Sequence, residues 1–456
     1  MYALEGSEMS PLHESLITCY QSIINRYPHE SEFHQSVHEV FQTIDVVVQR
    51  SPHYLDAKIP ELLCIPERQI LFRVPWLDDQ NRPQINQGYR VEFNSALGPY
   101  KGGVRLHPSV NLSIIKFLGF EQTFKNALTG IGIGGGKGGS DFDPKGRSAS
   151  EILRFCQSYM TELYRHIGQQ TDIPAGDIGV GQREIGYLFG QYRRITNRWE
   201  AGVITGKGTA WGGSHVRQQA TGYGVVFFLQ EALRKKQDDI EGKRCVVSGS
   251  GNVALYTIEK LQQFGGHCVA CSDSDGVLYH PDGLDLALLK EIKFTNRERL
   301  AVYCQHHRDA KLLPAGSLWS LPCDLAIPAA TQNELTLSDA KALISNGCQA
   351  VAEGANMPTT PEAITCLTQG GVLFLPGKAA NAGGVITSGL EMRQNVQRTQ
   401  WSFAETEQQL ALCMQDVHTL CYDTAETFGH PGNYTIGANC AGFIRVADAM
   451  LAQGLI

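Results

Sequence analysis

The chain has 456 residues, of which 42% are hydrophobic and 19% are charged, so it has the apolar content for a large buried core and an ordinary wetted surface. Its formal net charge of -7 is modest, which argues against nucleic acid or an anionic membrane as the main partner and leaves a small-molecule substrate. The length predicts about two or three domains, and the lack of a membrane-length apolar run or an export signal predicts a cytoplasmic protein with no membrane partner.

The helices and strands of the first half follow from the spacing of its apolar residues. Apolar residues recur every three or four positions between Phe33 and Val48, which predicts an amphipathic helix. Residues 66–105 alternate between apolar and polar in "QILFRVPWLDD" and "YRVEFNSAL", which predicts strands, and residues 112–128 predict a long helix. The residues before about Glu30 carry no pattern that we can assign.

A run of glycines, "NALTGIGIGGGKGGSDFDP" (126–144), surrounds a single lysine, Lys137. A Walker-type phosphate loop needs Gly six residues before the lysine and Ser or Thr after it, whereas this chain has Ile131 and Gly138. A flexible linker is also disfavoured, because the run leads into "SDFDP" and a helical pattern from Ser150. We therefore predict a buried turn, in which glycine allows positive backbone dihedrals and close approach of a ligand to the Lys137 amine.

After a glycine-rich, hinge-like stretch at residues 206–214, the pattern changes to strands alternating with helices. A strand, a tight glycine turn, a helix and a second strand are expected between residues 244 and 273. Further strands are expected at residues 323–330, 348–355 and 371–377, a long helix at residues 403–428, and a tail that packs back on the first domain. This order predicts an α/β chain with a doubly wound parallel sheet in its second domain.

The thirteen cysteines are expected to be reduced thiols, because nothing marks the chain for export. The one C-x-x-C pair, Cys268 and Cys271, falls on a predicted strand, where residues three apart point to opposite faces. No second Cys or His pair completes a tetrahedral site, so we expect no metal there.

The segment "GSGNVA", residues 249–254, matches the G-x-G-x-x-A form of the dinucleotide-binding fingerprint. It follows a predicted strand, opens a predicted helix and has an acidic residue, Asp273, about 20 positions later, which is the context that the motif requires. Glycine at the first two motif positions allows the sharp turn and the approach of a pyrophosphate, and Ala254 keeps the helix close to the sheet. The candidate cofactor contacts in this loop are Gly249, Ser250, Gly251, Asn252 and Val253.

The residues around the second strand leave the choice between NAD and NADP open. Asp273 favours NAD, because a carboxylate binds the ribose hydroxyls and repels a 2'-phosphate. Ser272 and Ser274 can instead hydrogen-bond a phosphate, to which nearby basic residues can add charge. Those basic residues, which also fit a solvated helix face, are Lys293, Arg297 and Arg299.

Three lysines of the first domain form a candidate substrate site: Lys101 in "GPYKGG", Lys125 in "GFEQTFKNAL", and Lys137. Gln122 lies one helical turn before Lys125 and therefore on the same face. Several ammonium groups in one pocket suit a dianionic substrate, and their repulsion and desolvation lower the pKa of the most buried one, as a catalytic lysine requires. Lysines are also common on solvated surfaces, so spacing alone leaves both interpretations open.

A carboxylate, Asp177 in "TDIPAGDIGVG", is the second catalytic candidate. It has no cation beside it in the sequence, and Asp in a Pro/Gly segment is also a common turn former. Gly383 and Gly384 suggest another close backbone approach, with Ser388 as a polar contact in the same region.

Taken in order, these segments resemble the glutamate dehydrogenases, specifically the hexameric NADP-dependent kind of bacteria and lower eukaryotes. The likeness runs from about Glu32 to the C-terminus and includes "GPYKGG", "GFEQTFKNAL", "GGGKGGSDFDPKG", "PAGDIGVG", "VSGSGNVA", "ATQNEL", "AEGANMPTT" and "PGKAANAGGV". It implies reversible oxidation of L-glutamate to 2-oxoglutarate and ammonia in a homohexamer, with NADP as the cofactor and NAD as the alternative. The implied fold has an N-terminal α/β substrate-binding and oligomerisation domain (residues 1–209, with 433–456 packed on it) and a Rossmann-like nucleotide-binding domain (210–432).

The resemblance also implies a role for each candidate residue. Lys137 would be the general acid/base and Asp177 would move protons to and from the amine. The substrate side-chain carboxylate would lie on Lys101 and Ser388, the α-carboxylate on Gln122 and Lys125, and the substrate amine near the Gly176 backbone. Thr221 and Asn252 would contact the cofactor, in addition to the fingerprint loop, Asp273, Ser274 and Lys293.

One position departs from the family pattern, which usually reads Arg-x-Glu-Ala-Thr-Gly where this chain has Gln219 in place of the glutamate. The change removes a carboxylate near the cofactor. Two alternatives stand beside glutamate oxidation: a related dehydrogenase of leucine, valine or phenylalanine, and a catalytically silent paralogue that binds nucleotide. Lys101 and Ser388 favour glutamate, because an apolar substrate side chain has no charge to pair.

Overall fold

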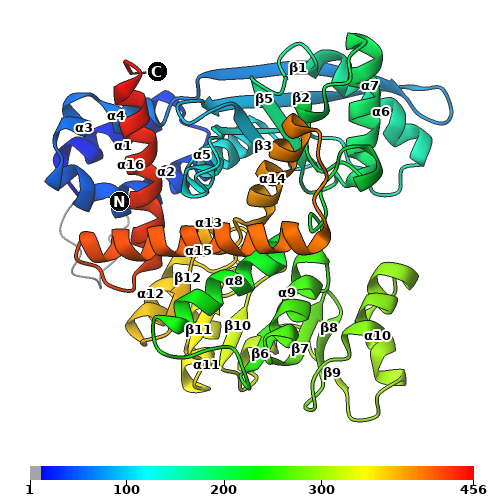
Figure 1. Cartoon of the computed structure of the whole chain (residues 1–456), viewed down its shortest axis with the longest axis vertical. Helices are drawn as coiled ribbons and strands as arrows, with labels where there is room; N and C mark the ends of the chain where they lie inside the picture. The colour runs from blue at the N-terminus through cyan, green and yellow to red at the C-terminus, as the bar shows by residue number, and fades with distance from the viewer. Residues whose placement is uncertain (1–11, 456) are drawn as a thin grey trace.

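The computed structural model describes residues 12–455, which fold around two β-sheets (Figure 1). The first sheet has five strands in the order β1-β2-β4-β3-β5. Their bounds are β1 (Arg68–Leu77), β2 (Pro83–Asn94), β3 (Tyr100–Leu106), β4 (Gly135–Ser140) and β5 (Asp172–Gly176). The β1–β2 hairpin and the β2–β4 pair are antiparallel, whereas β3 pairs in parallel with both β4 and β5. The strands expected within residues 66–105 are thereby confirmed.

Helices cover both faces of this sheet, and apolar side chains fill the space between them. One face carries α5 (Leu112–Leu128), which packs with α1 (Glu14–Arg26), α2 (Ser31–Arg50) and α16 (Tyr434–Ala452) in one buried cluster. The other face carries α6 (Ala149–Leu163) and α7 (Gln182–Thr196), which share a second cluster with β1 and β3. The helices expected at 33–48 and 112–128 are confirmed, and the residues before Glu30 that carried no pattern include α1.

The glycine run forms a buried strand, β4, and our prediction of a turn was wrong. Within residues 126–144 only Gly130 and Gly132, which precede the strand, have positive φ. In β4 itself glycine serves close packing: a Cβ on Gly135 would lie 2.0 Å from Thr123 Oγ1 of α5, and one on Gly139 would lie 2.6 Å from the Arg105 carbonyl oxygen. The missing side chains let β4 lie directly against α5 and β3. Lys137 stands in the middle of this strand, with two glycines on either side of it.

The second sheet has seven strands in the order β12-β11-β10-β6-β7-β8-β9. Their bounds are β6 (Arg244–Val247), β7 (His267–Asp273), β8 (Gly276–Tyr279), β9 (Lys311–Leu313), β10 (Leu325–Ile327), β11 (Ala350–Ala352) and β12 (Leu373–Leu375). The five strands from β12 to β7 are parallel, as expected, but β8 and β9 add an antiparallel edge that we did not predict. The sheet is therefore doubly wound and mixed.

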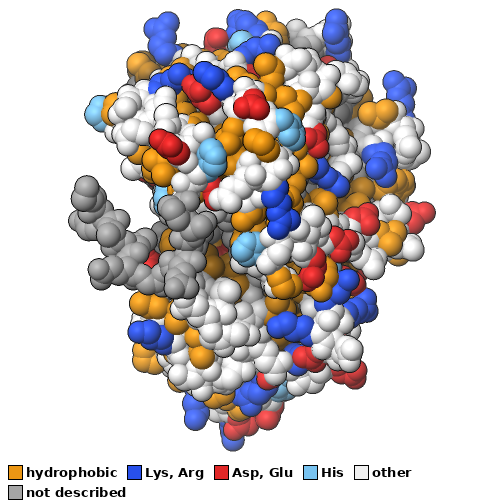
Figure 2. Space-filling view, turned by 90° about the vertical axis from the view of Figure 1, so that its left-hand side faces the viewer, with side chains coloured by type: hydrophobic (Ala, Val, Ile, Leu, Met, Phe, Trp, Pro, Cys, Tyr) orange, Lys and Arg blue, Asp and Glu red, His pale blue; other side chains and the backbone are white. Residues whose placement is uncertain are grey.

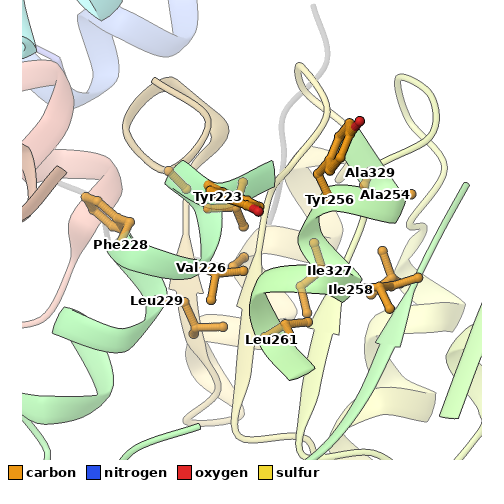
Figure 3. Packing of buried hydrophobic residues seen from close by; sticks show 14 of the residues in the cluster. Tyr223, Val226, Phe228, Leu229, Ala254, Tyr256, Ile258, Leu261, Ile327 and Ala329 are labelled. Carbon is orange, nitrogen blue, oxygen red and sulfur yellow. The ribbon is translucent and has the colours of Figure 1, made fainter. Parts of the chain in front are cut away.

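We call the first sheet with the helices that cover it the first body, and the second sheet with its helices the second body. The core of the second body lies between its sheet and the helices α8 (Ala220–Arg234) and α9 (Asn252–Gln263). Figure 3 labels Val226 and Leu229 of α8, Ile258 and Leu261 of α9, and Ile327 of β10, which belong to the same buried cluster. All five side chains are fully buried, and such burial contributes about 1.5–3 kcal/mol for each aliphatic side chain. Helices α11 (Leu337–Ser345) and α12 (Pro361–Gln369) pack with apolar residues of the same sheet in a separate cluster.

Three helices connect the second sheet back to the first. They are α13 (Gly377–Ala380), α14 (Gly383–Gln397) and α15 (Phe403–Thr427), and α15 lies between the two sheets (Figure 1). The chain then enters α16, whose buried Cys440, Phe443 and Val446 pack in the cluster around α5. The remaining short elements are α3 (His53–Asp56), α4 (Ile59–Leu62), η1 (Ala201–Val203), η2 (Thr209–Trp211), α10 (Leu286–Lys290), η3 (Glu291–Asn296), η4 (Leu300–Gln305) and η5 (Leu318–Ser320).

The surface agrees with the modest net charge. On the face that Figure 2 presents, basic and acidic side chains are interspersed, so no field of one sign covers it. Within residues 12–455, no helix is both long enough and apolar enough to span a membrane.

Candidate active site

A cleft of about 460 Å³ lies between the two sheets, and residues from both bodies line it. The sequence candidates that line it are Lys101, Gln122, Lys125, Lys137, Gly176, Asp177, Thr221, Val253 and Ser388. The fold thus brings together residues from β3, α5, β4, the end of β5, α8, α9 and α14. The first and last of them, Lys101 and Ser388, are 287 positions apart in the sequence. A neighbouring cleft shares Asp177 and Thr221 and is lined by Gln219 and Asn252.

The two catalytic candidates form an ion pair: Lys137 Nζ lies 3.0 Å from Asp177 Oδ2. Arg105 of β3 also binds this oxygen, because its Nε donates a hydrogen bond to Asp177 Oδ2 over 2.9 Å. The sequence showed no cation near Asp177, and in space it has two. Both come from adjacent strands, which residue spacing along the chain does not reveal.

Burial controls the protonation of this cluster. Burial lowers the pKa of Lys137, which Asp177 counteracts and Arg105 reinforces. Burial alone would raise the pKa of Asp177, but Lys137 and Arg105 hold it well below its usual range. Burial also lowers the pKa of Lys125 to about 8. A carboxylate therefore stays ionised beside two lysines that lose their protons more easily than in water.

Lys101 is a buried cation, with only 1% of its surface exposed. Burial lowers its pKa well below the usual value, and the positive charges of Arg217 and Arg90 add to that effect. Among residues 12–455 no carboxylate forms an ion pair with it, because nearby Asp172 is paired with Arg90. An ammonium group without its own anion at the wall of a cleft is a site for an anionic ligand.

Arg217 is a candidate that the sequence analysis missed. It lines the same cleft as Lys101 and Ser388, and its buried Nε has no hydrogen-bond partner within residues 12–455. Burial lowers its pKa. The sequence signal was present, since Arg217 opens the segment in which Gln219 departs from the family pattern. A guanidinium beside Lys101 adds a second donor for a carboxylate, with planar geometry suited to two hydrogen bonds.

Lys125 of α5 contacts the second body. Lys125 Nζ donates to Asn356 Oδ1 over 2.9 Å and to Asn381 Oδ1 over 2.8 Å, and both asparagines belong to the second body. Gln122 donates to Asn126 within α5. Asn356 and Asn381 lie in the segments "AEGANMPTT" and "PGKAANAGGV", but the sequence analysis singled out neither asparagine. Lys125 therefore joins the walls of the cleft.

The fingerprint loop has the geometry that a pyrophosphate requires. Gly249 has φ of +86°, and Gly251 is the N-cap of α9, with open space where its Cβ would stand. Ala254 is buried, as expected for the position that sets the helix against the sheet. The free N–H groups at the start of α9 and the open face of Gly251 fit a dinucleotide phosphate.

Asp273, at the end of β7, is already occupied by the protein. Its carboxylate accepts hydrogen bonds from the backbone N–H groups of Asp275 (2.9 Å) and Leu300 (3.0 Å). Lys293 Nζ lies 3.8 Å from the same side chain, and Arg299 donates to Ser274 Oγ over 2.6 Å. The acid is thus partly neutralised, and the exposed Ser274 and Arg299 lie together beside it. A phosphate group fits beside this arrangement better than it would beside an Asp273 carboxylate without partners.

Comparison with known proteins identifies the family. Residues 212–454 match the family "Glutamate/Leucine/Phenylalanine/Valine dehydrogenase", and residues 66–194 match "Glu/Leu/Phe/Val dehydrogenase, dimerisation domain". The chain belongs to the Glu/Leu/Phe/Val dehydrogenase family. The α/β fold that we expected from the sequence is the fold of this family's structures.

Relatives within the family match nearly the whole chain. The NADP-specific glutamate dehydrogenase of Helicobacter pylori is 54% identical over 442 residues, which cover 95% of this chain and 98% of that one. The Escherichia coli protein of the same name is 53% identical over 445 residues, covering 97% and 99%. The structure of Plasmodium falciparum glutamate dehydrogenase superposes with a TM-score of 0.95 at 48% identity, covering 97% and 95% of the two chains. A hetero-hexameric glutamate dehydrogenase from Thermus thermophilus gives 0.80 at 28% identity, covering 99% and 100%.

Proposed function

We propose that this protein is an NADP-dependent glutamate dehydrogenase, which interconverts L-glutamate with 2-oxoglutarate and ammonium. One observation carries the proposal: the Lys137–Asp177 pair shares its cleft with four further basic side chains, which are Lys101, Arg105, Lys125 and Arg217. A dicarboxylic substrate needs cations for two carboxylates, and the reaction needs a proton donor and acceptor at the carbon between them. The relatives named as NADP-specific glutamate dehydrogenases, which cover nearly the whole chain, support the same activity.

The binding roles follow from the positions of the cations. Lys101 and Arg217, with Ser388 of α14, form the end of the cleft that takes the side-chain carboxylate. Lys125 and Gln122 of α5 take the α-carboxylate, which places the α-carbon beside Lys137. The Gly176 backbone, next to Asp177, contacts the substrate amine.

Lys137 and Asp177 move the protons of the reaction. When bound, the nicotinamide cofactor supplies the hydride chemistry by exchanging a hydride with the α-carbon, which interconverts the amine and an iminium ion. Neutral Lys137 takes a proton from the water that adds to the iminium carbon. Asp177 then relays this proton from Lys137 to the nitrogen. The C–N bond breaks as Lys137, neutral again, takes the proton of the hydroxyl group, and ammonia leaves as the ketone forms. Burial lowers the pKa of Lys137 and so makes the neutral form available.

The cofactor lies across the start of α9 and the end of β7. The open face of Gly251 fits the pyrophosphate, and Gly249, Ser250, Asn252, Val253 and Thr221 complete that part of the site. At the adenosine end, Asp273 is held by two backbone N–H groups, whereas the exposed Ser274, which Arg299 contacts, can meet a 2'-phosphate. Lys293 lies nearby. This favours NADP, as do the names of the relatives.

A dehydrogenase of leucine, valine or phenylalanine is disfavoured by Lys101. An apolar substrate side chain would leave the ammonium group of Lys101 and the Nε of Arg217 buried without a partner. An uncompensated buried charge costs about 3–5 kcal/mol. A catalytically silent paralogue is disfavoured because the Lys137–Asp177 pair is assembled.

We also propose the organisation of the working enzyme. Residues 1–209 together with 433–456 act as the substrate-binding and oligomerisation domain, and residues 210–432 act as the cofactor domain. A cytoplasmic homohexamer fits both the family's dimerisation domain and the hetero-hexameric assembly named for the Thermus thermophilus relative.

The test is the initial rate of reduced-cofactor oxidation with 2-oxoglutarate and ammonium, measured with NADPH and with NADH. We expect turnover and a preference for NADPH. The oxo acids of leucine, valine and phenylalanine serve as controls and should react far more slowly. No turnover with either cofactor would refute the enzyme, and a preference for NADH would refute only the cofactor assignment.

A further inference from the structure

Arg105 lines the cleft and binds the candidate catalytic carboxylate of Asp177. It lies on β3, four residues after Lys101, and 16% of its side chain is exposed. Its Nε and Lys137 Nζ both bind Asp177 Oδ2, at 2.9 Å and 3.0 Å. Within residues 12–455 no group hydrogen-bonds Asp177 Oδ1. The carboxylate is therefore held by one oxygen, and the other oxygen is available to a ligand in the cleft.

The backbone of β3 is built to hold this arrangement. Strands β3 and β5 are parallel, with Val104 opposite Gly176, so Arg105 lies beside Asp177. A Cβ on Gly103 would stand 2.8 Å from Asp177 Cβ, which means that only glycine leaves room for the aspartate over the strand. The two residues around Val104 thus act together: Gly103 makes the space and Arg105 holds the carboxylate that fills it.

We propose that Arg105 is a positioning residue that fixes Asp177 by Oδ2 and presents Oδ1 to the substrate nitrogen. This inference rests on the proposed function. During turnover Lys137 gives up its proton, and its ion pair with Asp177 then loses its charge. A guanidinium group keeps its charge at every stage of such a reaction, because arginine is not deprotonated in proteins. Arg105 keeps Asp177 anionic and oriented at the stage when Lys137 cannot.

Arg105 also sets the acid side of the pH profile. The charges that face Asp177 are Lys137 from β4 and Arg105 from β3, with Arg217 and Lys125 farther away. Arg105 lowers the pKa of Lys137 as well as that of Asp177. Glutamate oxidation begins with both groups deprotonated, so removing Arg105 raises both pKa values and moves the acidic limb of kcat/KM for L-glutamate to higher pH.

The test compares Arg105→Met with Arg105→Lys in the full-length protein. Arg82→Met is the matched control, because Arg82 Nε also binds an aspartate, Asp78 Oδ2, at 2.8 Å but lies in the β1–β2 turn. For Arg105→Met we expect kcat/KM for ammonium to fall by about 100-fold, the usual effect of a misplaced catalytic group. We expect the acidic limb of kcat/KM for L-glutamate to move up in pH. The KM for 2-oxoglutarate and the Kd for NADPH should stay close to the wild-type values.

Arg105→Lys keeps the charge but not the planar donor, so it should leave the acidic limb near its original pH while kcat/KM for ammonium still falls. This variant also decides the question if Arg105→Met does not fold. An unmoved limb in Arg105→Met, a wild-type ammonium kcat/KM in Arg105→Lys, or an equal loss in Arg82→Met would overturn the proposal. A wild-type protein without turnover would instead refute the proposed function, so the two failures are distinguishable.

Discussion

The buried ion pair between Lys207 and Glu391 offers a quantitative test of how α14 is held. Both side chains are fully buried, and Lys207 Nζ lies 2.7 Å from Glu391 Oε1. The other oxygen of Glu391 accepts the backbone N–H of Gly206 at 3.0 Å. Ser388, proposed to bind the substrate, lies one turn before Glu391 on α14. The pair therefore joins α14, the helix that carries Ser388, to the segment that leads out of the first body.

Replacing Glu391 by leucine leaves the Lys207 ammonium buried without its anion, which costs about 3–5 kcal/mol. At about 2 cal/mol/K of unfolding entropy per residue, a chain of this length loses roughly 1 °C of Tm per kcal/mol, so we expect a fall of about 3–5 °C. Because α14 loses its anchor, the KM for 2-oxoglutarate should also rise.

The double variant Lys207→Met/Glu391→Leu provides the control. It removes both charges and leaves mainly the Gly206 N–H without its acceptor, so it should be more stable than Glu391→Leu alone. Thermal denaturation followed by circular dichroism measures the double variant and both single variants, Lys207→Met and Glu391→Leu. Strictly additive losses from the two single variants would refute the reasoning, since they would mean that the two charges do not interact.

Three further predictions concern single side chains. Lys137→Ala should lower kcat by about 100- to 10,000-fold while leaving NADPH binding, measured by fluorescence titration, nearly unchanged; substantial residual turnover would place the catalytic proton elsewhere. Lys101→Leu should raise the KM for 2-oxoglutarate far more than the KM for ammonium, and an equal rise in both would contradict our assignment of the side-chain carboxylate. Burial raises the pKa of Glu353 to about 7, so its contribution to stability is complete below about pH 4.5 and is lost as the pH rises through about 7. Glu353→Gln should therefore match the wild type in Tm near pH 5 and exceed it at pH 8, and a pH-independent difference would exclude this titration.

Much of the site could be predicted because its residues lie in segments with strong local patterns. Gln122 and Lys125 share a helical face, and the fingerprint loop combines a strand, glycines and a helix start within a dozen residues. The partners of Asp177 could not be found in this way. Arg105 and Lys137 meet it only because β3 lies between β4 and β5 in the sheet, and strand order is not encoded in local spacing.

The glycine run shows a different limit. We predicted a turn because glycine permits positive φ. In β4, however, glycine is needed because a Cβ would clash with the neighbouring α5 and β3, which are close only in the folded chain. The antiparallel edge β8–β9 escaped for a related reason. Its strands have four and three residues, which is too short for a periodic signal.

The position of α16 has a consequence for folding during synthesis on the ribosome. Phe443 and Val446, near the end of the chain, fill the same apolar cluster as Phe41 and Phe120 near its beginning. The first body is therefore translated first but can be completed only after the second body has been made. Until then its unfinished core exposes apolar surface, so a nascent or truncated chain that lacks α16 should depend on chaperones and be prone to aggregation.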